Sequence, residues 1–186
     1  VKASTDDPIH DATSNVLGLI NVLQAAVAHG ARKIVFASSG GTVYGDCPII
    51  PSPEDAPLAP MSPYGITKMV GEHYLRFFKD VHGLDFTIFR YGNVYGPRQD
   101  PHGEAGVVAI FAKKLIAGQA PTIHWDGEQR KDYVHVSDVA RANEAALAGG
   151  SGRAYNIGAG VATSVNELLA GLETQLKTGI QPHYGP

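Results

Sequence analysis

The chain has 186 residues, of which 44% are hydrophobic and 18% are charged, and its formal net charge is −3. This slightly acidic balance argues against a nucleic-acid partner, because binding to nucleic acid needs a basic face. The sequence contains no run of about 18 apolar residues, so no membrane span is expected. The length suffices for one full hydrophobic core, and the single cysteine, Cys47, excludes an internal disulfide.

Helices and strands are predicted to alternate in the first half of the chain. After an extended N-terminal segment, apolar residues recur at helical spacing over 10–29, and a β-branched run over 33–39 predicts a buried strand. Prolines exclude regular structure over 48–63. A second long helix is predicted over 64–82, and the apolar run 85–91 predicts another buried strand. This alternation indicates a parallel α/β sheet.

Shorter elements are predicted in the second half. In chain order they are a helix over VVAIFAKKLIAG, short strands at PTIHW and YVHV, a helix over SDVARANEAALAG and a strand at AYNIG. Ser137 or Asp138 can cap the start of the second of these helices. Ser164 and Glu167 have the spacing of a capping box, which predicts the start of a last helix.

Tyr64 and Lys68 lie at the start of the second long helix, in the sequence YGITK. Their i, i+4 spacing places the phenol and the ammonium on one helix face. A free phenol has a pKa of about 10, and a neighbouring ammonium lowers it by favouring the phenolate. Such a pair can take a proton from a hydroxyl group. Taken alone, the spacing is a weak signal and fits an ordinary solvated helix pair better.

Five motifs in a fixed order surround this pair. They are FASSGGTVYG (36–45), SPYGITKMVGEHY (62–74), RYGNVYGPRQ (90–99), KDYVHVSDVA (131–140) and YNIGAG (155–160). The set resembles the extended short-chain dehydrogenase/reductase family, the NAD-dependent epimerases and dehydratases of nucleotide sugars, and is most similar to its UDP-glucose (UDP-galactose) 4-epimerases. The resemblance covers essentially the whole chain. It implies NAD as cofactor, a UDP-hexose as substrate and a transient 4-keto sugar as intermediate.

The resemblance assigns the catalytic residues one by one. Tyr64 matches the catalytic tyrosine, and Lys68 matches the lysine that also holds the nicotinamide ribose. The family's third catalytic residue, a Ser or Thr, falls on Gly40 here, which is a departure from the pattern. Ser39 and Thr42 flank this position, and either can supply the missing hydroxyl, with Thr42 slightly favoured.

The resemblance also implies a set of cofactor contacts. Ser14 and Asn15 match a helix segment that touches the cofactor, where Ser14 has the usual position of contact and Asn15 also suits a structural role. Ser38, Tyr91 and Gly92 match stretches that pass beside the nicotinamide, as do Tyr64 and Lys68.

The substrate contacts implied by the resemblance include Thr42 and Tyr64. Asn93 matches an asparagine that contacts the nucleotide sugar. Lys131 stands where the family usually has an arginine that grips the substrate phosphate, with Arg130 beside it. Lysine neutralises phosphate without the bidentate fork of arginine, which weakens the expected grip.

The expected fold is a Rossmann-like, doubly wound parallel sheet that lacks its first strands, with a small α/β substrate-binding region. We assign 1–96 to the NAD-binding part and 97–186 to the substrate-binding part, with 131–160 as a segment that can return to the first. The histidines show no ligand spacing, so no metal is expected. We expect a cytoplasmic homodimer, paired through the helices 10–29 and 64–82.

Two other interpretations remain open. A nucleotide-sugar dehydratase or decarboxylase of the same family usually carries acidic residues after its catalytic threonine, where this chain has Gly40, Gly41 and Thr42. A non-catalytic remnant is the second alternative, because the family's glycine-rich NAD turn is absent from the sequence. We therefore expect an interior piece of a longer enzyme, one that by itself binds NAD weakly and is inactive.

Overall fold

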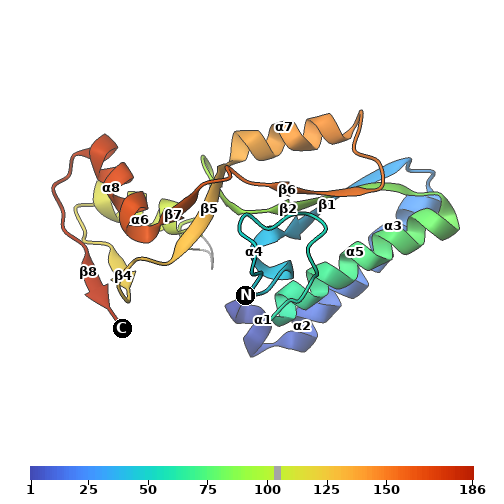
Figure 1. The fold of residues 1–186 in the computed structure, drawn as a ribbon, viewed down its shortest axis with the longest axis horizontal. Helices are drawn as coiled ribbons and strands as arrows, with labels where there is room; N and C mark the ends of the chain where they lie inside the picture. Colours follow the sequence, from blue (N-terminus) through green and yellow to red (C-terminus); the bar gives the residue numbers. More distant parts are fainter. Residues whose placement is uncertain (103–105) are drawn as a thin grey trace. The chain divides into compact units, whose positions relative to one another are not determined.

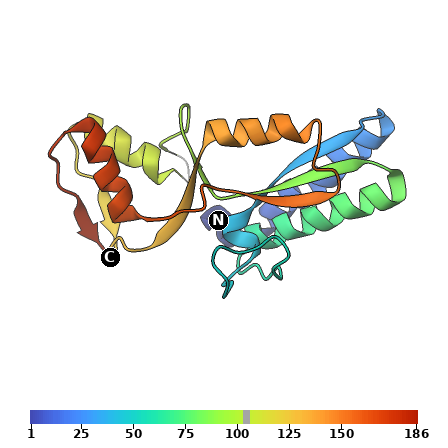
Figure 2. The same cartoon turned by 45° about the horizontal axis from the view of Figure 1, so that its top comes forward.

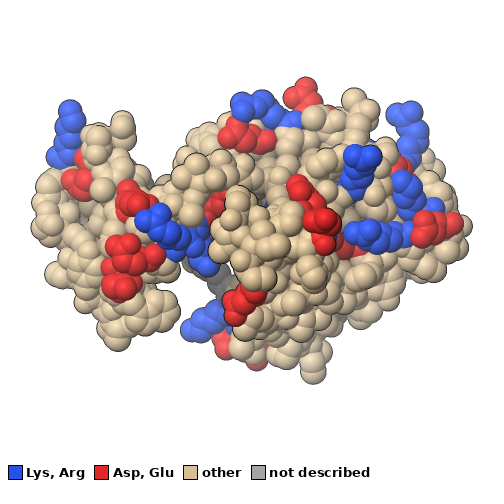
Figure 3. Space-filling view, in the orientation of Figure 1, with Lys and Arg blue, Asp and Glu red and all other residues tan. Residues whose placement is uncertain are grey.

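The computed structural model describes residues 1–102 and 106–186. The chain forms two compact units, Val1–Gly92 with Asp138–Ile157, and Asn93–Ser137 with Gly158–Pro186. No helix among the described residues is both long and apolar enough to cross a membrane. On the face shown in Figure 3, basic and acidic side chains are interspersed.

The first unit is built on a parallel sheet. Its helices and strands are α1 (Lys2–Asp6), α2 (Pro8–Ala12), the π-helix η1 (Thr13–Leu17), α3 (Gly18–Ala28), β1 (Lys33–Ser39), α4 (Gly40–Val43), α5 (Pro63–His82), β2 (Asp85–Tyr91), α7 (Val136–Ala146, whose first two residues belong to the second unit) and β6 (Arg153–Ile157). The strand order is β1-β2-β6. Helices α3 and α5 lie on one face of this sheet and α7 on the other (Figures 1 and 2). The expected α/β fold with a parallel sheet is confirmed.

The core of the first unit lies between β2 and the two helices α3 and α5. Its buried side chains are Leu23, Leu75, Phe78, Leu84, Phe86 and Ile88. At Gly71 a Cβ atom would lie 2.7 Å from the Phe36 ring and 3.0 Å from the Leu19 side chain. The absence of a side chain at this position therefore allows α5 to approach β1 closely.

One prediction about the N-terminal region is wrong, and a second, the helix over 10–29, is confirmed with a local irregularity. The expected extended segment contains α1, where the Ser4 hydroxyl donates to the Val1 carbonyl at 2.6 Å, and Asp7 then caps α2 by accepting from the His10 amide at 2.9 Å. The helix predicted over 10–29 is not a single regular α-helix. It contains the π-helical turn η1, which ends where the Gly18 amide donates to the Thr13 carbonyl.

The second unit combines short strands with two helices. Its elements are β3 (Asn93–Tyr95), α6 (Val107–Ile116), β4 (Thr122–His124), β5 (Arg130–His135), β7 (Ala162–Ser164), α8 (Val165–Leu176) and β8 (His183–Gly185). β5 pairs in parallel with β3 and antiparallel with β7, while β4 and β8 form a separate parallel pair. α6 and α8 bury Phe111, Leu115, Val165 and Leu169 against Ile123.

The helix boundaries of the second half agree with the sequence in one case and differ in another. The capping box of α8 is confirmed, because the Ser164 hydroxyl accepts from the Glu167 amide at 3.1 Å and the Glu167 carboxylate accepts from the Ser164 amide at 2.8 Å. α7 begins at Val136, so Ser137 and Asp138 lie in its first turn and do not precede it.

Candidate active site

Tyr64 and Lys68 project from the first turns of α5. The Ser62 hydroxyl caps this helix by accepting from the Gly65 amide at 3.1 Å, and Pro63 occupies its first position. The Lys68 ammonium lies 5.5 Å from the centre of the Tyr64 ring. It donates to the carbonyl of Ala37 in β1 at 3.1 Å. The phenol and the ammonium are therefore neighbours on the face of α5 that is turned toward the end of β1.

Burial dominates the acid–base properties of both groups. It raises the pKa of Tyr64 above its ordinary value, a hydrogen bond from Ser39 lowers that pKa, and the charge of Asp11 raises it. Burial lowers the pKa of Lys68, against the charge of Asp11, which raises it. Contrary to the expectation from the i, i+4 spacing, the ammonium does not bring the phenol pKa below its ordinary value. A further positive charge next to the phenol would lower it.

The segment after β1 explains the departure at Gly40. A Cβ atom there would lie 3.1 Å from the carbonyl oxygen of Arg90 and 3.4 Å from that of Tyr91. Tight packing against β2 thus disfavours a side chain at this position. The two candidate hydroxyls differ, because Ser39 is close enough to the Tyr64 phenol to lower its pKa, whereas the Thr42 Oγ1 atom is buried and has no hydrogen-bond partner among the described residues.

Ser14 and Asn15, expected at the cofactor, lie in η1. The Ser14 side chain is exposed, and the Asn15 amide donates to the Asp11 carboxylate at 2.8 Å. The other carboxylate oxygen of Asp11 accepts from the hydroxyl of Thr67 in α5, also at 2.8 Å. Asn15 therefore helps to fix η1 against α5 through Asp11.

The remaining expected cofactor contacts lie at the carboxyl ends of β1 and β2. The Ser38 side chain is only 3% exposed and donates to the Glu72 carboxylate at 2.6 Å. The Tyr91 hydroxyl accepts from Asn143 at 2.8 Å, and the Gly92 amide donates to the carbonyl of Ile157 in β6 at 2.9 Å. These groups already have partners within the protein.

The expected phosphate and sugar contacts belong to the second unit. The Asn93 side chain donates to the Asp132 carbonyl at 3.4 Å. Arg130 forms an ion pair with Glu167 at 2.9 Å and donates to the Ala162 carbonyl at 2.7 Å. Lys131 is exposed, and its ammonium has no ion pair within the described part of the chain. Of the two basic side chains, Lys131 is the one available to a ligand.

A buried ion pair between Glu72 and Arg90 is the main feature that the sequence interpretation missed. Arg90 Nη2 lies 2.7 Å from Glu72 Oε2, and the two side chains are 2% and 1% exposed. Burial lowers the pKa of Arg90, but hydrogen bonds to Glu72 and Tyr44 raise it and leave it above its ordinary value. The available signals were an arginine within an otherwise apolar strand, and a glutamate eight residues after Tyr64 on the same helix face.

Comparison with known proteins places these features in a family. Residues 1–158 match the model of the NAD dependent epimerase/dehydratase family. The chain is 49% identical over 169 residues to a putative UDP-glucose 4-epimerase of Methanocaldococcus jannaschii, a match that covers 91% of this chain and 55% of that protein.

Two solved structures resemble the whole chain. The UDP-glucose 4-epimerase of Thermotoga maritima, solved with UDP-glucose, matches with a TM-score of 0.97 and 44% identity, over 100% of this chain and 60% of that one. The UDP-glucose 4-epimerase of Thermus thermophilus, in complex with NAD, matches with a TM-score of 0.92 and 43% identity, over 100% of this chain and 61% of that one. The chain thus spans a little over half the length of these relatives. It belongs to the NAD dependent epimerase/dehydratase family.

Proposed function

We propose that the protein containing this chain interconverts UDP-glucose and UDP-galactose by epimerisation at C4, through a transient 4-keto sugar. The observation that carries the proposal is the group formed by Tyr64, Lys68 and Ser39 at the carboxyl end of β1. In parallel α/β sheets this end of the strands is where ligands bind. The similarity to UDP-glucose 4-epimerases along the full chain supports the choice of substrate.

The residues at this end of the sheet fit a bound NAD. The Lys68 ammonium, held beside the phenol of Tyr64, can reach a ribose hydroxyl, and the buried Thr42 Oγ1 lacks a partner that a ligand can supply. Ser14, on the exposed side of η1, is a further contact in this proposal. When bound, NAD supplies a hydride acceptor and a positive charge, and that charge lowers a phenol pKa that burial has raised.

Tyr64 is the proton carrier in this proposal. Its phenolate takes the proton of the C4 hydroxyl while the C4 hydrogen leaves as hydride, which yields the 4-keto sugar. The Ser39 hydroxyl, which lowers the pKa of the phenol, stabilises the phenolate. In the second half-reaction hydride returns to the opposite face of C4, and Tyr64 gives its proton back to the sugar oxygen. Protons and hydride therefore balance over the cycle.

The residues around α4 favour epimerisation over dehydration. Expelling water from a 4-keto sugar needs a positioned acid. Residues 40–43 read Gly-Gly-Thr-Val, and none of them is acidic. On the substrate side we assign phosphate binding to Lys131 and sugar contact to Asn93, with Arg130 in a supporting role because Glu167 engages it.

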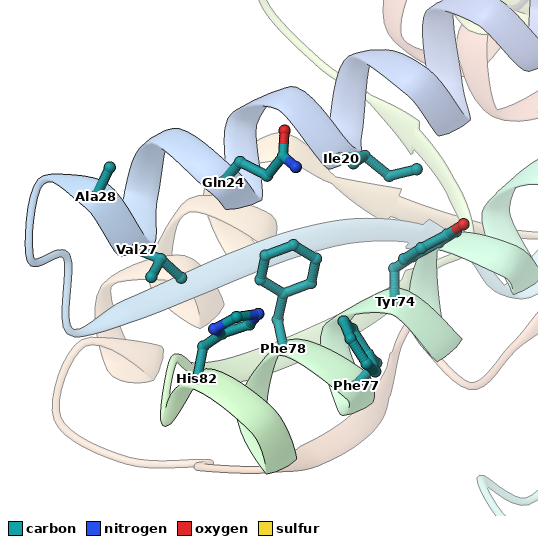
Figure 4. Close-up of a pocket in the computed structure, with 8 residues that line it drawn as sticks. All are labelled: Ile20, Gln24, Val27, Ala28, Tyr74, Phe77, Phe78 and His82. Carbon is teal, nitrogen blue, oxygen red and sulfur yellow. The ribbon is translucent and has the colours of Figure 1, made fainter.

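We also propose that two copies pair through the segments 10–29 and 64–82, in a cytoplasmic protein. Val22, Phe77 and Val81 on α3 and α5 are 56%, 50% and 59% exposed. Figure 4 shows the groove between these helices, where rings of α5 face side chains of α3. The groove carries no carboxylate or ammonium and is lined by Ile20, Gln24, Val27, Ala28, Tyr74, Phe77, Phe78 and His82. A second copy of the same two helices offers a matching apolar surface.

The substitution Tyr64→Phe in the complete protein tests the proposed function. Without the proton acceptor, turnover of UDP-galactose in a coupled assay should fall on the order of a hundredfold or more. Tyr155→Phe, which removes a phenol from β6, serves as the control and should keep wild-type turnover. Near-normal turnover of Tyr64→Phe would remove Tyr64 from the mechanism, and loss of water from the sugar in the wild type would favour the dehydratase.

A further inference from the structure

Ser38, Glu72, Arg90 and Tyr44 form a hydrogen-bonded group inside the first unit, which we call the buried brace. Glu72 Oε1 accepts from the Ser38 hydroxyl at 2.6 Å and from Arg90 Nε at 2.9 Å. Glu72 Oε2 accepts from Arg90 Nη2 at 2.7 Å, and Arg90 Nη1 donates to the Tyr44 hydroxyl, also at 2.7 Å. All four residues are at most 5% exposed. The brace thus joins α5, β1, β2 and the segment after α4.

The brace is contiguous with the candidate active site. Three consecutive residues at the end of β1 each face a different residue of α5: the Ala37 carbonyl accepts from Lys68 at 3.1 Å, Ser38 donates to Glu72 at 2.6 Å, and Ser39 is close enough to Tyr64 to lower the pKa of its phenol. Tyr64, Lys68 and Glu72 follow one another at intervals of four residues and share a helix face. The bond from Ser38 to Glu72 therefore lies between the bond of Lys68 to the Ala37 carbonyl and the approach of Ser39 to Tyr64.

The brace does more than fill the core. Buried ion pairs contribute little net stability compared with apolar side chains of the same volume. What they provide is direction, since a carboxylate accepts several bonds at fixed angles. Glu72 is held from one side by Arg90, whose Cα pairs with that of Ser38 across the sheet, and it receives Ser38 on the other side. The end of β1 is consequently tied to α5 at a defined separation.

We propose that Ser38 is a positioning residue, whose buried hydrogen bond to Glu72 holds the end of β1 against α5 and so keeps the Ser39 hydroxyl beside the Tyr64 phenol. This role rests on the proposed function of Tyr64 and replaces the direct contact with NAD that the resemblance implied for the Ser38 hydroxyl. The hydrogen bond affects turnover and not substrate binding, because it makes no contact with the proposed substrate-binding residues of the second unit. Effects of this kind lower kcat and leave KM largely unchanged.

Two substitutions in the complete protein separate positioning from packing. Ser38→Ala and Tyr44→Phe each remove one buried hydroxyl from the same ion pair, on the Glu72 side and on the Arg90 side respectively. We expect Ser38→Ala to lower kcat for UDP-galactose about tenfold with KM within about twofold. Tyr44→Phe should lower the melting temperature and keep kcat per folded molecule within about twofold of the wild type.

A second readout needs neither substrate nor turnover. The titration of Tyr64 is followed by tyrosinate absorbance, as the difference between each protein and its Tyr64→Phe counterpart. The Ser39 bond lowers the pKa of Tyr64, so losing that bond in Ser38→Ala should move this titration to higher pH. The charged groups that act on Tyr64 or lie over its ring, Asp11 and Lys68, are present in both variants. Tyr44→Phe should leave the titration in place.

The outcomes are distinct. If Ser38→Ala lowers the melting temperature but keeps the wild-type kcat and Tyr64 titration, the hydrogen bond is purely structural. The same conclusion follows if Ser38→Ala and Tyr44→Phe shift the Tyr64 titration equally. If Ser38→Ala does not fold, Ser38→Cys, which keeps the volume and weakens the donor, should show the same displacement in smaller measure. A wild-type protein without epimerase activity would refute the proposed function alone, because the titration still tests the position of Ser39.

Discussion

Replacing Arg90 by methionine should be among the most damaging single changes in the first unit. Arg90 and Glu72 are 2% and 1% exposed in their side chains, so Arg90→Met leaves a carboxylate in the interior with the Ser38 hydroxyl as its remaining donor. Removing one partner of such a pair costs about 3–5 kcal/mol. At about 2–4 °C per kcal/mol for a protein of this size class, the melting temperature should fall by roughly 6–20 °C.

The double variant Arg90→Met/Glu72→Leu sharpens this prediction. Replacing both charges by apolar side chains of similar volume removes the uncompensated carboxylate, so most of the lost stability should return. Urea unfolding of the wild type, both single variants and the double variant, followed by circular dichroism, gives the coupling energy directly. A loss below about 1 kcal/mol in Arg90→Met, or a double variant no more stable than the single one, would refute the view of a closed, water-free ion pair.

Three further outcomes follow from the geometry. If the contact with Tyr64 decides which hydroxyl serves catalysis, Ser39→Ala should lower turnover more than Thr42→Val, and the reverse ranking in the same coupled assay would return the role to Thr42. Phe77→Glu places a charge on the exposed apolar face of α5 and should yield a monomer in analytical ultracentrifugation. The control Gln175→Glu, on α8, should leave the dimer intact. A dimer that persists in Phe77→Glu would place the interface elsewhere. Ser164→Ala removes the cap of α8 and should destabilise the second unit by about 1 kcal/mol in thermal unfolding, and an unchanged midpoint would show that the Glu167 half of the capping box suffices.

The sequence was most informative where one structural period extends over many residues. The strands 33–39 and 85–91 and the helix expected over 64–82 lie where their apolar patterns predict them. The helix buries one face, and the strand 85–91 is buried on both. The capping box of Ser164 and Glu167 could also be predicted from the sequence, because its two residues are only three positions apart. Strands of three residues, such as β3, β7 and β8, were missed because so few residues establish no alternation.

The sequence could not predict two kinds of feature: contacts between residues far apart in the chain, and the single extra residue in a helical turn. The π-helical turn of η1 leaves the apolar spacing of its helix nearly unchanged, so the pattern there cannot reveal it. The bond between Ser38 and Glu72 joins residues 34 positions apart, and the pairing of Glu72 with Arg90 follows only once β2 and α5 are packed together. For the same reason the sequence left Ser39 and Thr42 as alternatives, and which hydroxyl serves catalysis stays a prediction.

The glycine at position 71 ties the assembly of the active site to the order of folding. Glycine weakens a helix interior by about 1 kcal/mol relative to alanine, and α5 contains Gly65 as well as Gly71. A 20-residue helix with two such positions and several β-branched and aromatic residues has little helicity of its own in water. It becomes stable only when β1 and β2 are present to cover it. Tyr64 and Lys68 can therefore adopt their mutual geometry only once the sheet is present, so partly folded chains lack the proposed proton-transfer pair.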